Sequence, residues 1–202
     1  MKNSKITRKI TQGMYVLTTP GGGCVVDAVS RVGGSGEQAL VSVAIAKTNK
    51  SNELLRENDK FALSILSEQA NPELIQNFGF KTAREFDKLA SVETEEVAGV
   101  EVIKDSIGYM VFEKVDAIEN ETHTLFIGRL IEADLFEPDA ESMTYAYYQE
   151  HKDSLTKTTT EQGKTAWICT ACGYIYYGDE VPDDYKCPLC GLGKSFFKKK
   201  TD

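Results

Sequence analysis

Four of the chain's five cysteines lie near its C-terminal end, in the stretch "WICTACGYIYYGDEVPDDYKCPLC". They form two Cys-x-x-Cys pairs, Cys169 with Cys172 and Cys187 with Cys190, and fourteen residues separate the pairs. Each pair presents two thiolates on one side of a turn, and two facing turns complete a tetrahedral four-sulfur metal site. Because this spacing suits both zinc and iron, it predicts a metal site without choosing the metal.

The segment that holds these cysteines is small. A module of about forty residues buries too little apolar surface to fold by itself, so metal binding has to supply much of its folding free energy. We expect its core to consist of aromatic side chains beside the metal: Trp167, Tyr174, Tyr176 and Phe196.

The same stretch resembles a rubredoxin, with the motifs "CxxCGY", "PDD" and "CPLCG", although its middle loop is shorter than in a free-standing rubredoxin. The resemblance implies one iron held by the four cysteines and transfer of one electron. Acidic residues in the shortened loop form either a solvated turn or a docking patch for a basic redox partner: Asp179, Glu180, Asp183 and Asp184.

The rest of the chain has to supply whatever exchanges electrons with such a centre. Its segments rich in Val, Ile, Leu and aromatic residues predict strands at 13–19, 24–32, 39–46, 61–66, 108–118 and 123–135. They do not alternate with long helices, which favours a mainly β antiparallel barrel or sandwich over a doubly wound sheet.

Helices are expected as short excursions between these strands. Ser51 is expected to cap one helix, Asn71 and Pro72 to begin a second, and residues 82–90 to form a third. The Thr-rich residues 152–164 predict a linker, which divides the chain into a domain at 1–151 and a small domain at 165–202.

Charge and hydropathy exclude some functions. The net charge is −8, and the first 163 residues hold 17 of the 23 Lys and Arg but 26 of the 31 Asp and Glu. An acidic body without a basic stripe does not predict a nucleic-acid partner. No apolar run has the length of a membrane span and no signal peptide is evident, so we expect a cytoplasmic protein without a membrane partner.

A candidate anion site follows the predicted strand at 39–46. Lys47, Asn49 and Ser51 supply an ammonium, an amide and a hydroxyl at a helix start, where a phosphate would fit. The alternative is an ordinary strand-to-helix turn with a serine cap. "GSGEQA" at 34–39 matches a dinucleotide fingerprint, but a strand follows it where that motif needs a helix, so a Rossmann domain is rejected.

Residues 11 to about 150 resemble the flavin reductase-like, or flavoredoxin, family. The resemblance is carried by "MYVLTT", "CVVDAVS", "VSVAIAKTNKSNELL", "FGFKTAREFDKL", "THTLFIGRLIEADL" and "TYAYYQE". It implies an FMN-binding split β-barrel with short helices that commonly dimerises. Together with the C-terminal rubredoxin-like iron module, the chain resembles the high-molecular-weight rubredoxins.

The resemblance also implies which residues contact FMN. Lys47, Asn49 and Ser51 would hold the phosphate, and residues 27–30 would lie along the ring and ribityl chain: Asp27, Ala28, Val29 and Ser30. A further loop would contribute Phe80, Lys81, Arg84 and Lys88. Arg84 and Lys88 would contact the phosphate or the ring, or else are surface charges on a short helix.

Two of these positions have a particular chemistry. His123 corresponds to a recurrent His near the flavin and is a candidate catalytic residue for proton transfer, or else a strand-end His at the barrel rim. Asp27 stands where the family usually has Asn, so it either faces away from the flavin or helps to set its potential. The fifth cysteine, Cys24, is expected to be a small buried apolar residue on a strand.

These observations predict an electron-transfer flavoprotein with two cofactors, FMN and one iron held by four cysteines. Resemblance implies a homodimer that takes electrons from NAD(P)H through an NAD(P)H-rubredoxin reductase and passes them to a flavodiiron protein that reduces oxygen or nitric oxide. The alternatives are an NAD(P)H-dependent flavin or ferric reductase that uses the nucleotide directly, and a zinc-stapled binding module.

Overall fold

The computed structural model describes residues 4–155, 165–171, 174–187 and 191–199. The chain divides into two compact units, Met1–Lys157 and Thr158–Asp202. None of the helices in the described ranges combines the length and the apolar character that crossing a bilayer requires.

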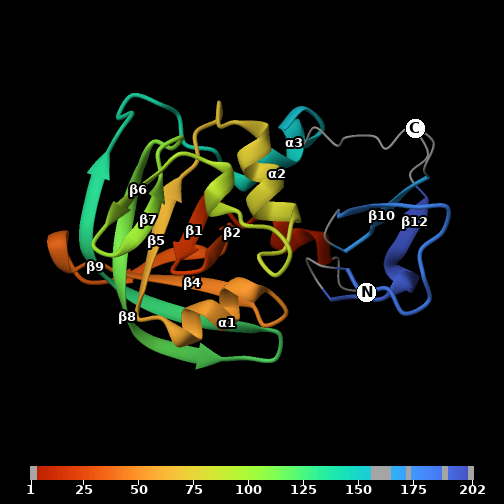
Figure 1. Cartoon of the computed structure of the whole chain (residues 1–202), viewed down its shortest axis with the longest axis horizontal. Coiled ribbons are helices and arrows are strands. Elements are labelled where there is room, and N and C mark those ends of the chain that lie inside the picture. Colours follow the sequence, from red (N-terminus) through yellow and green to blue (C-terminus); the bar gives the residue numbers. More distant parts are fainter. Residues whose placement is uncertain (1–3, 156–164, 172–173, 188–190, 200–202) are drawn as a thin grey trace. The chain divides into compact units, whose positions relative to one another are not determined.

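The larger unit is built on one curved antiparallel sheet (Figure 1). Its strands lie in the order β2-β1-β5-β8-β9-β4-β3. Their bounds are β1 Tyr15–Thr19, β2 Gly22–Val26, β3 Val29–Gly33, β4 Leu40–Ala46, β5 Lys60–Ile65, β8 Gly108–Glu119 and β9 His123–Leu135.

The two edge strands of this sheet are consecutive in the chain. The prediction of a single strand at 24–32 is therefore wrong, because residues Asp27 and Ala28 interrupt it and carry the chain from β2 at one edge to β3 at the other. The amide of Ala44 on β4 donates to the carbonyl of Ala28 at 3.0 Å, which holds this crossing beside the sheet. The sheet is thus a split barrel whose gap lies at Asp27–Ala28.

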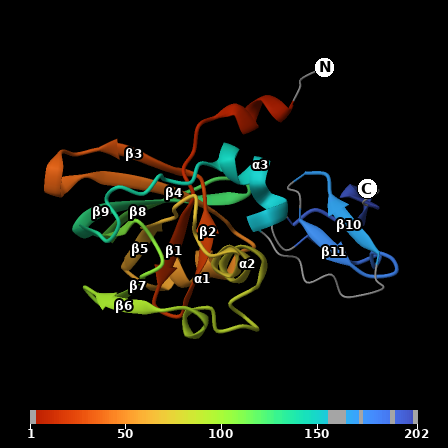
Figure 2. The same ribbon diagram turned by 90° about the horizontal axis from the view of Figure 1, so that it is seen from above.

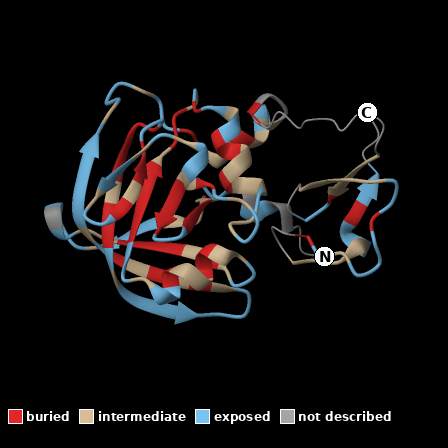
Figure 3. Cartoon of the chain, viewed as in Figure 1, coloured by how far each residue is buried: buried red, intermediate tan, exposed pale blue. Residues whose placement is uncertain are grey.

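The barrel interior is filled by buried apolar side chains, and Figure 3 shows long buried stretches on the inner strands. Phe61 and Phe112 stack there with their ring centroids 5.1 Å apart. Gly128 on β9 allows this stacking, because a Cβ at that position would lie 2.6 Å from the Phe61 ring. Most of this core comes from the segments rich in Val, Ile, Leu and aromatic residues that predicted the strands.

In the described part of the chain, three α-helices accompany the sheet: α1 Lys50–Glu57, α2 Pro72–Phe80 and α3 Tyr145–Leu155. The side chain of Asn71 caps α2 by accepting from the amide of Glu73 at 2.9 Å, as predicted. α2 and α3 bury a second apolar cluster, which includes Phe78 and Tyr148. Helix α3 continues to Leu155, into the residues that the sequence predicts as linker.

Residues 82–90 do not form the predicted α-helix. They make a series of turns that ends in the 3-10 helix η3, Leu89–Ser91. The hydroxyl of Thr82 accepts from the amide of Arg84 at 3.2 Å, and this local bond competes with helix formation.

Two other 3-10 helices, η1 Ser4–Lys9 and η2 Gly36–Gln38, lie earlier in the chain. The strand β4 follows η2, where a Rossmann motif would need a helix, which agrees with the rejection of that motif.

A hairpin that the sequence did not predict lies between α2 and β8. Strands β6 (Thr94–Val97) and β7 (Val100–Ile103) pair around a turn in which Ala98 and Gly99 have φ values of +50° and +87°. Positive φ at both central residues is typical of a tight hairpin turn.

The smaller unit contains a three-stranded sheet of order β11-β10-β12. Its elements are β10 Ala166–Cys169, β11 Ile175–Tyr177, the 3-10 helix η4 Lys194–Phe196 and β12 Phe197–Lys199. Figure 2 shows the strands β10 and β11 of this unit side by side.

Candidate functional site: a flavin cradle and a thiolate metal centre

The first cysteine of each pair lies in the core of the smaller unit. Cys169 and Cys187 are 1% and 2% exposed, and both belong to a cluster with Val181 and Phe197. Cys172 and Cys190, the other two predicted metal ligands, lie outside the described residues. Two buried thiols from separate turns in one small core fit one half of the predicted four-sulfur donor set.

Backbone bonds shape the two turns that present these thiols. The amide of Cys169 donates to the carbonyl of Tyr174 at 2.7 Å, and the amide of Gly191 donates to the carbonyl of Cys187 at 2.8 Å. Gly191 has φ +71°, which favours glycine after the second cysteine of a pair. Each of these bonds thus joins the first cysteine of a pair to a described residue that follows the pair.

The aromatic core differs from the prediction at one position. Trp167, Tyr174 and Tyr176 pack against the cysteine cluster as predicted, but Phe196 is 40% exposed and Phe197 is buried in its place. Phe197 belongs to β12, where alternation points it inward. The core also includes Tyr185, which was not predicted from the sequence, and burial raises the pKa of this phenol.

In the larger unit, the candidate phosphate site lies where β4 leads into α1. Asn49, not Ser51 as predicted, caps the helix, and its side-chain oxygen accepts from the amide of Ser51 at 2.9 Å. The Ser51 side chain is instead fully buried, and its hydroxyl has no hydrogen-bond partner among the described residues. A buried hydroxyl without a partner is costly and marks a place where a ligand atom is expected.

Lys47, the charged member of the site, is held by the turn between β8 and β9. Its ammonium donates to the carbonyl of Asn120 at 2.5 Å and pairs with the carboxylate of Glu119 at 2.9 Å. Its amide donates to the carbonyl of Thr122 at 3.0 Å. The ladder between β4 and β9 explains this position, because Ala46 lies opposite His123.

The same turn positions His123. The side-chain oxygen of Asn120 accepts from the amide of His123 at 2.8 Å, and the ring Nδ1 is 2.8 Å from the hydroxyl of Thr122. His123 also lies within electrostatic range of Asp27. The structure thus brings three predicted residues, Lys47, His123 and Asp27, to one end of the barrel.

Asp27 is partly buried beside the gap of the barrel. Burial raises the pKa of its carboxyl, while the amides of Asp27 and Ala28 and the charge of His123 lower it. The next two predicted contacts, Val29 and Ser30, lie on β3 opposite Val43 and Ser42 of β4, and the Ser30 side chain is exposed.

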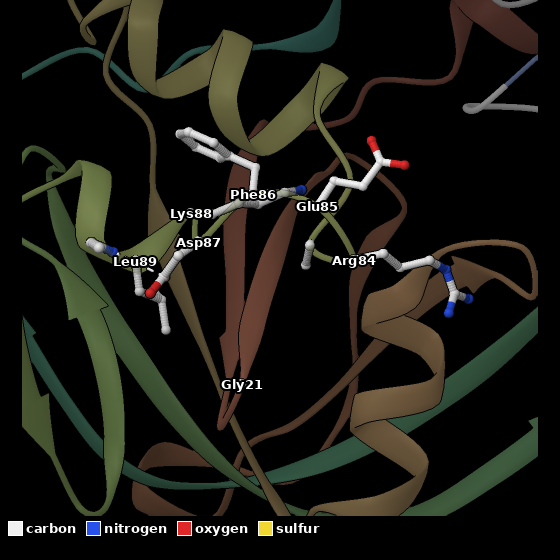
Figure 4. Close-up of a pocket in the computed structure, with 9 residues that line it drawn as sticks. Gly21, Arg84, Glu85, Phe86, Asp87, Lys88 and Leu89 are labelled. Atoms are coloured by element: carbon white, nitrogen blue, oxygen red, sulfur yellow. Dashed lines mark hydrogen bonds between the residues drawn. The ribbon is translucent and has the colours of Figure 1, made fainter.

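The four predicted residues of the following loop make contacts within the protein. Phe80 packs against the α2 core, and the ammonium of Lys81 lies 3.9 Å from the centre of the Phe86 ring. Arg84 pairs with Glu53 of α1. In Figure 4 Arg84 extends toward that helix and away from the other labelled side chains of the loop.

Lys88 is buried at 3% exposure, so the alternative of a surface charge on a short helix is wrong for this residue. Its ammonium donates to the carbonyls of Gly23 and Phe78, each at 3.0 Å. Burial lowers the pKa of Lys88. The residue thereby ties the loop to β2 and to α2, and it lines a pocket of about 390 Å³ together with Gly21 and residues 83–90.

Cys24 lies on β2 at 2% exposure, as predicted for a small apolar residue. Burial raises the pKa of its thiol, whereas Ser51, Lys88 and Asn49 lower it. The Ser51 hydroxyl is thus close to this sulfur without a hydrogen bond of good geometry. Cys24 is therefore a packing residue at the inner wall of the candidate phosphate site.

The residues at the start of α1 fit a flavin phosphate. The orphaned Ser51 hydroxyl, the capped helix N-terminus and the Lys47 ammonium are the donors that bind phosphate at helix starts. Several charged neighbours of this site were not predicted: Lys50, Glu53, Arg56 and Glu119. The pairing of Arg56 with Glu119 is long-range, and no local spacing reveals it.

With this geometry in view, the chain is recognised as a member of the flavin reductase like domain family, whose model matches residues 7–156. A second family model, the rubrerythrin, rubredoxin-like domain, matches residues 167–198. The class of protein is therefore a flavin-linked, iron-binding electron-transfer protein with a split barrel and a rubredoxin-like domain.

One relative matches nearly the whole chain, and others match about three quarters of it or less. The chain is 29% identical to the "High molecular weight rubredoxin" of Moorella thermoacetica, over 98% of this chain and 99% of that one. It is 29% identical to the "Ferric-chelate reductase (NAD(P)H)" of Archaeoglobus fulgidus, over 75% of this chain and 91% of that one. The solved structure of "Flavin reductase PheA2 in native state" is 28% identical with a TM-score of 0.57, over 69% of this chain and 92% of that one.

Proposed function

We propose that this protein relays electrons from FMN, bound in the split barrel, to one iron held by Cys169, Cys172, Cys187 and Cys190. FMN supplies chemistry that an iron–thiolate centre lacks, because it takes up electrons in pairs and gives them up singly. Similarity to a high molecular weight rubredoxin over nearly the whole chain supports this pairing of cofactors.

The observation that carries the FMN part is the unpartnered Ser51 hydroxyl at the start of α1, which finds no acceptor or donor in the described residues. A phosphate oxygen would give this hydroxyl a partner, and the helix N-terminus and Lys47 would contribute further donors. Residues 27–30 would then lie along the ring and ribityl chain, and His123 would hold the proton that a reduced ring gains or loses.

Spectra and cofactor analysis of the full chain, purified without oxygen, test the proposal. We expect about one FMN and one iron per chain, with the absorption of ferric thiolate overlying that of flavin. Zinc in the cysteine site together with no measurable affinity for FMN would contradict it and would favour the zinc-stapled module.

We further propose an NAD(P)H-rubredoxin reductase as electron donor and a flavodiiron protein as acceptor. The acidic loop of the smaller unit supports docking of such partners, because all four of its acidic residues are exposed: Asp179, Glu180, Asp183 and Asp184. A basic partner would compete with Lys194, which pairs with Asp183 at 2.7 Å. Stopped-flow reduction of the chain, with and without a rubredoxin reductase, tests the donor. The acceptor is tested by reoxidation with a flavodiiron protein.

The second candidate is an NAD(P)H-dependent flavin or ferric reductase that uses the nucleotide directly. The similarity to the ferric-chelate reductase over 75% of the chain favours it. Under anaerobic conditions, bleaching of the flavin by NADH or NADPH alone at a catalytically useful rate would support this candidate. Bleaching that requires the separate reductase would support the relay.

Homodimer formation is the remaining part of the proposal. The β8–β9 hairpin supports it, because four apolar side chains spaced along its length are 40% to 56% exposed: Val115, Ile118, Ile131 and Leu135. Figure 3 shows long exposed stretches on both strands. Light scattering coupled to gel filtration should give twice the chain mass of 22.4 kDa. A mass equal to one chain would contradict a dimer.

A further inference from the structure

The carboxylate of Glu119 joins the candidate phosphate site from the end of β8. It pairs with Lys47 at 2.9 Å and with Arg56 of α1, and it accepts from the hydroxyl of Thr124 at 3.2 Å. Hydrogen bonds from Lys47 and Arg56, together with their positive charges, lower the pKa of Glu119. Glu119 is thus an anion at the place where Lys47 would meet the phosphate of a ligand.

We propose that Glu119 is a specificity-determining residue of the flavin site. Its carboxylate pairs with the ammonium of Lys47 until the phosphate of FMN takes its place. The inference rests on the proposed binding of FMN at this site. It concerns the difference between a flavin that carries a phosphate and riboflavin, which lacks one.

The exposure of the pair makes such an exchange feasible. The side chains of Lys47 and Glu119 are 38% and 46% exposed, and ion pairs this close to solvent are weak. A phosphate ester carries close to two negative charges near neutral pH, so it attracts an ammonium more strongly than one carboxylate does.

Lys47 stays in position when Glu119 is neutralised. Its ammonium also donates to the carbonyl of Asn120 at 2.5 Å, and its amide donates to Thr122 at 3.0 Å. Arg56 likewise keeps two other acceptors, the side-chain oxygens of Asn52 and Thr124, both at 2.8 Å. Loss of the Glu119 charge therefore removes an anion that competes with the phosphate for Lys47 and repels it. Lys47 and Arg56 stay in position.

Glu119→Gln is the direct test, because glutamine keeps the shape and one acceptor oxygen. Dissociation constants of FMN and riboflavin are measured by flavin fluorescence on the flavin-free full chain. We expect FMN to bind about three- to tenfold more tightly to Glu119→Gln than to the wild type, with riboflavin unchanged. Glu132→Gln, which removes the same charge from an exposed position further along β9, should change neither constant.

The Lys47→Met background shows whether Glu119 acts through Lys47. We expect Glu119→Gln to increase the affinity for FMN less in the Lys47→Met protein than in the wild type. Equal gains in both backgrounds would overturn the proposal, as would an unchanged FMN constant in Glu119→Gln. If the wild type binds FMN and riboflavin equally, the barrel still binds flavin but the inference is wrong. If it binds neither, the proposed function fails as well.

Discussion

Asp27 is the only acidic residue among the flavin contacts that the sequence predicts. Its carboxyl lies partly buried at the gap of the barrel, and burial raises its pKa. A carboxyl whose pKa is higher in the folded state than in the unfolded state destabilises the fold once it ionises. This cost is absent below the unfolded pKa of about 4 and is fully present above the folded pKa.

We therefore expect Asp27→Asn to raise the melting temperature of the flavin-free protein by about 2 °C at pH 7. The difference from the wild type should shrink as pH falls and vanish below about pH 4, where both side chains are neutral. Thermal unfolding followed by circular dichroism between about pH 3.5 and 8 measures it. Asp139→Asn, at an exposed turn position, should show no such trend. A uniform difference at every pH would contradict the burial argument.

At the scale of single elements, α1 matters because its first turn forms the candidate phosphate site. Asn49 caps this helix with the same Asx bond that Asn71 makes at α2, each 2.9 Å long. The two caps therefore form a matched pair for separating helix stability from ligand binding.

Asn49→Ala and Asn71→Ala should each lower the free energy of unfolding by about 1 kcal/mol, the usual cost of a lost helix cap. Only Asn49→Ala should also weaken FMN binding, because its helix start provides the donors of the phosphate site. Urea denaturation and fluorescence titration measure the two effects. Equal FMN affinities in the two variants would place the phosphate elsewhere.

The loop 82–91 is fixed by a single buried residue. Lys88 donates to carbonyls on β2 and at the end of α2, and its ammonium lies 5.8 Å from the centre of the Phe78 ring. In the Lys88→Met variant these carbonyls lose a charged donor inside the protein, so we expect a loss of about 2 kcal/mol in the free energy of unfolding.

Urea denaturation measures this loss, and Lys104→Met provides the control. The Lys104 side chain is 43% exposed and its ion pair with Glu95 is 3.8 Å long, so its removal should cost under about 0.5 kcal/mol. Similar stabilities of the two variants would mean that the free energy of burying the Lys88 ammonium cancels the stabilisation from its hydrogen bonds.

The elements that the sequence predicts well are long strands rich in Val, Ile, Leu and aromatic residues. β9 begins at His123 and ends at Leu135, as predicted, because the segment is rich in Leu, Ile and Phe. The break at Asp27–Ala28 was missed because it lies within one continuous segment rich in Val, and local composition does not register a change of sheet edge. Residues 82–90 resemble a helix locally, but the tertiary contacts of Lys88 override that propensity.

The candidate site also contains residues that the sequence predicts and residues that it does not. The choice of Lys47, Asn49 and Ser51 came from local spacing, and the structure places all three at the start of α1. Glu119 and Arg56 could not be found in this way, because their pairing joins residues 63 positions apart. In the smaller unit, the sequence placed the buried aromatic at Phe196 rather than Phe197, a shift of one residue that reverses the face of a strand.

At the scale of the whole molecule, two units of very different size share one chain. The larger unit has an extensive apolar core. Among the described residues, the core of the smaller one comprises two cysteines, two apolar side chains and four partly buried aromatic residues. The smaller unit should therefore depend on its metal for stability, whereas the barrel should not.

The chain's single tryptophan makes this difference measurable. Trp167 lies in the smaller unit, where its indole nitrogen donates to the carbonyl of Gly178 at 3.0 Å. Removal of the metal by acid and a chelator, or the substitution Cys187→Ser, should shift its emission to the red as the unit unfolds. The far-ultraviolet circular dichroism of the barrel and its FMN affinity should stay within about 10% of the wild type, because the barrel core contains no metal ligand that we propose. Refilling the site with ferrous iron should restore the emission of the chelated protein but not that of Cys187→Ser. A barrel that unfolds together with the smaller unit would show instead that the two fold as one cooperative body.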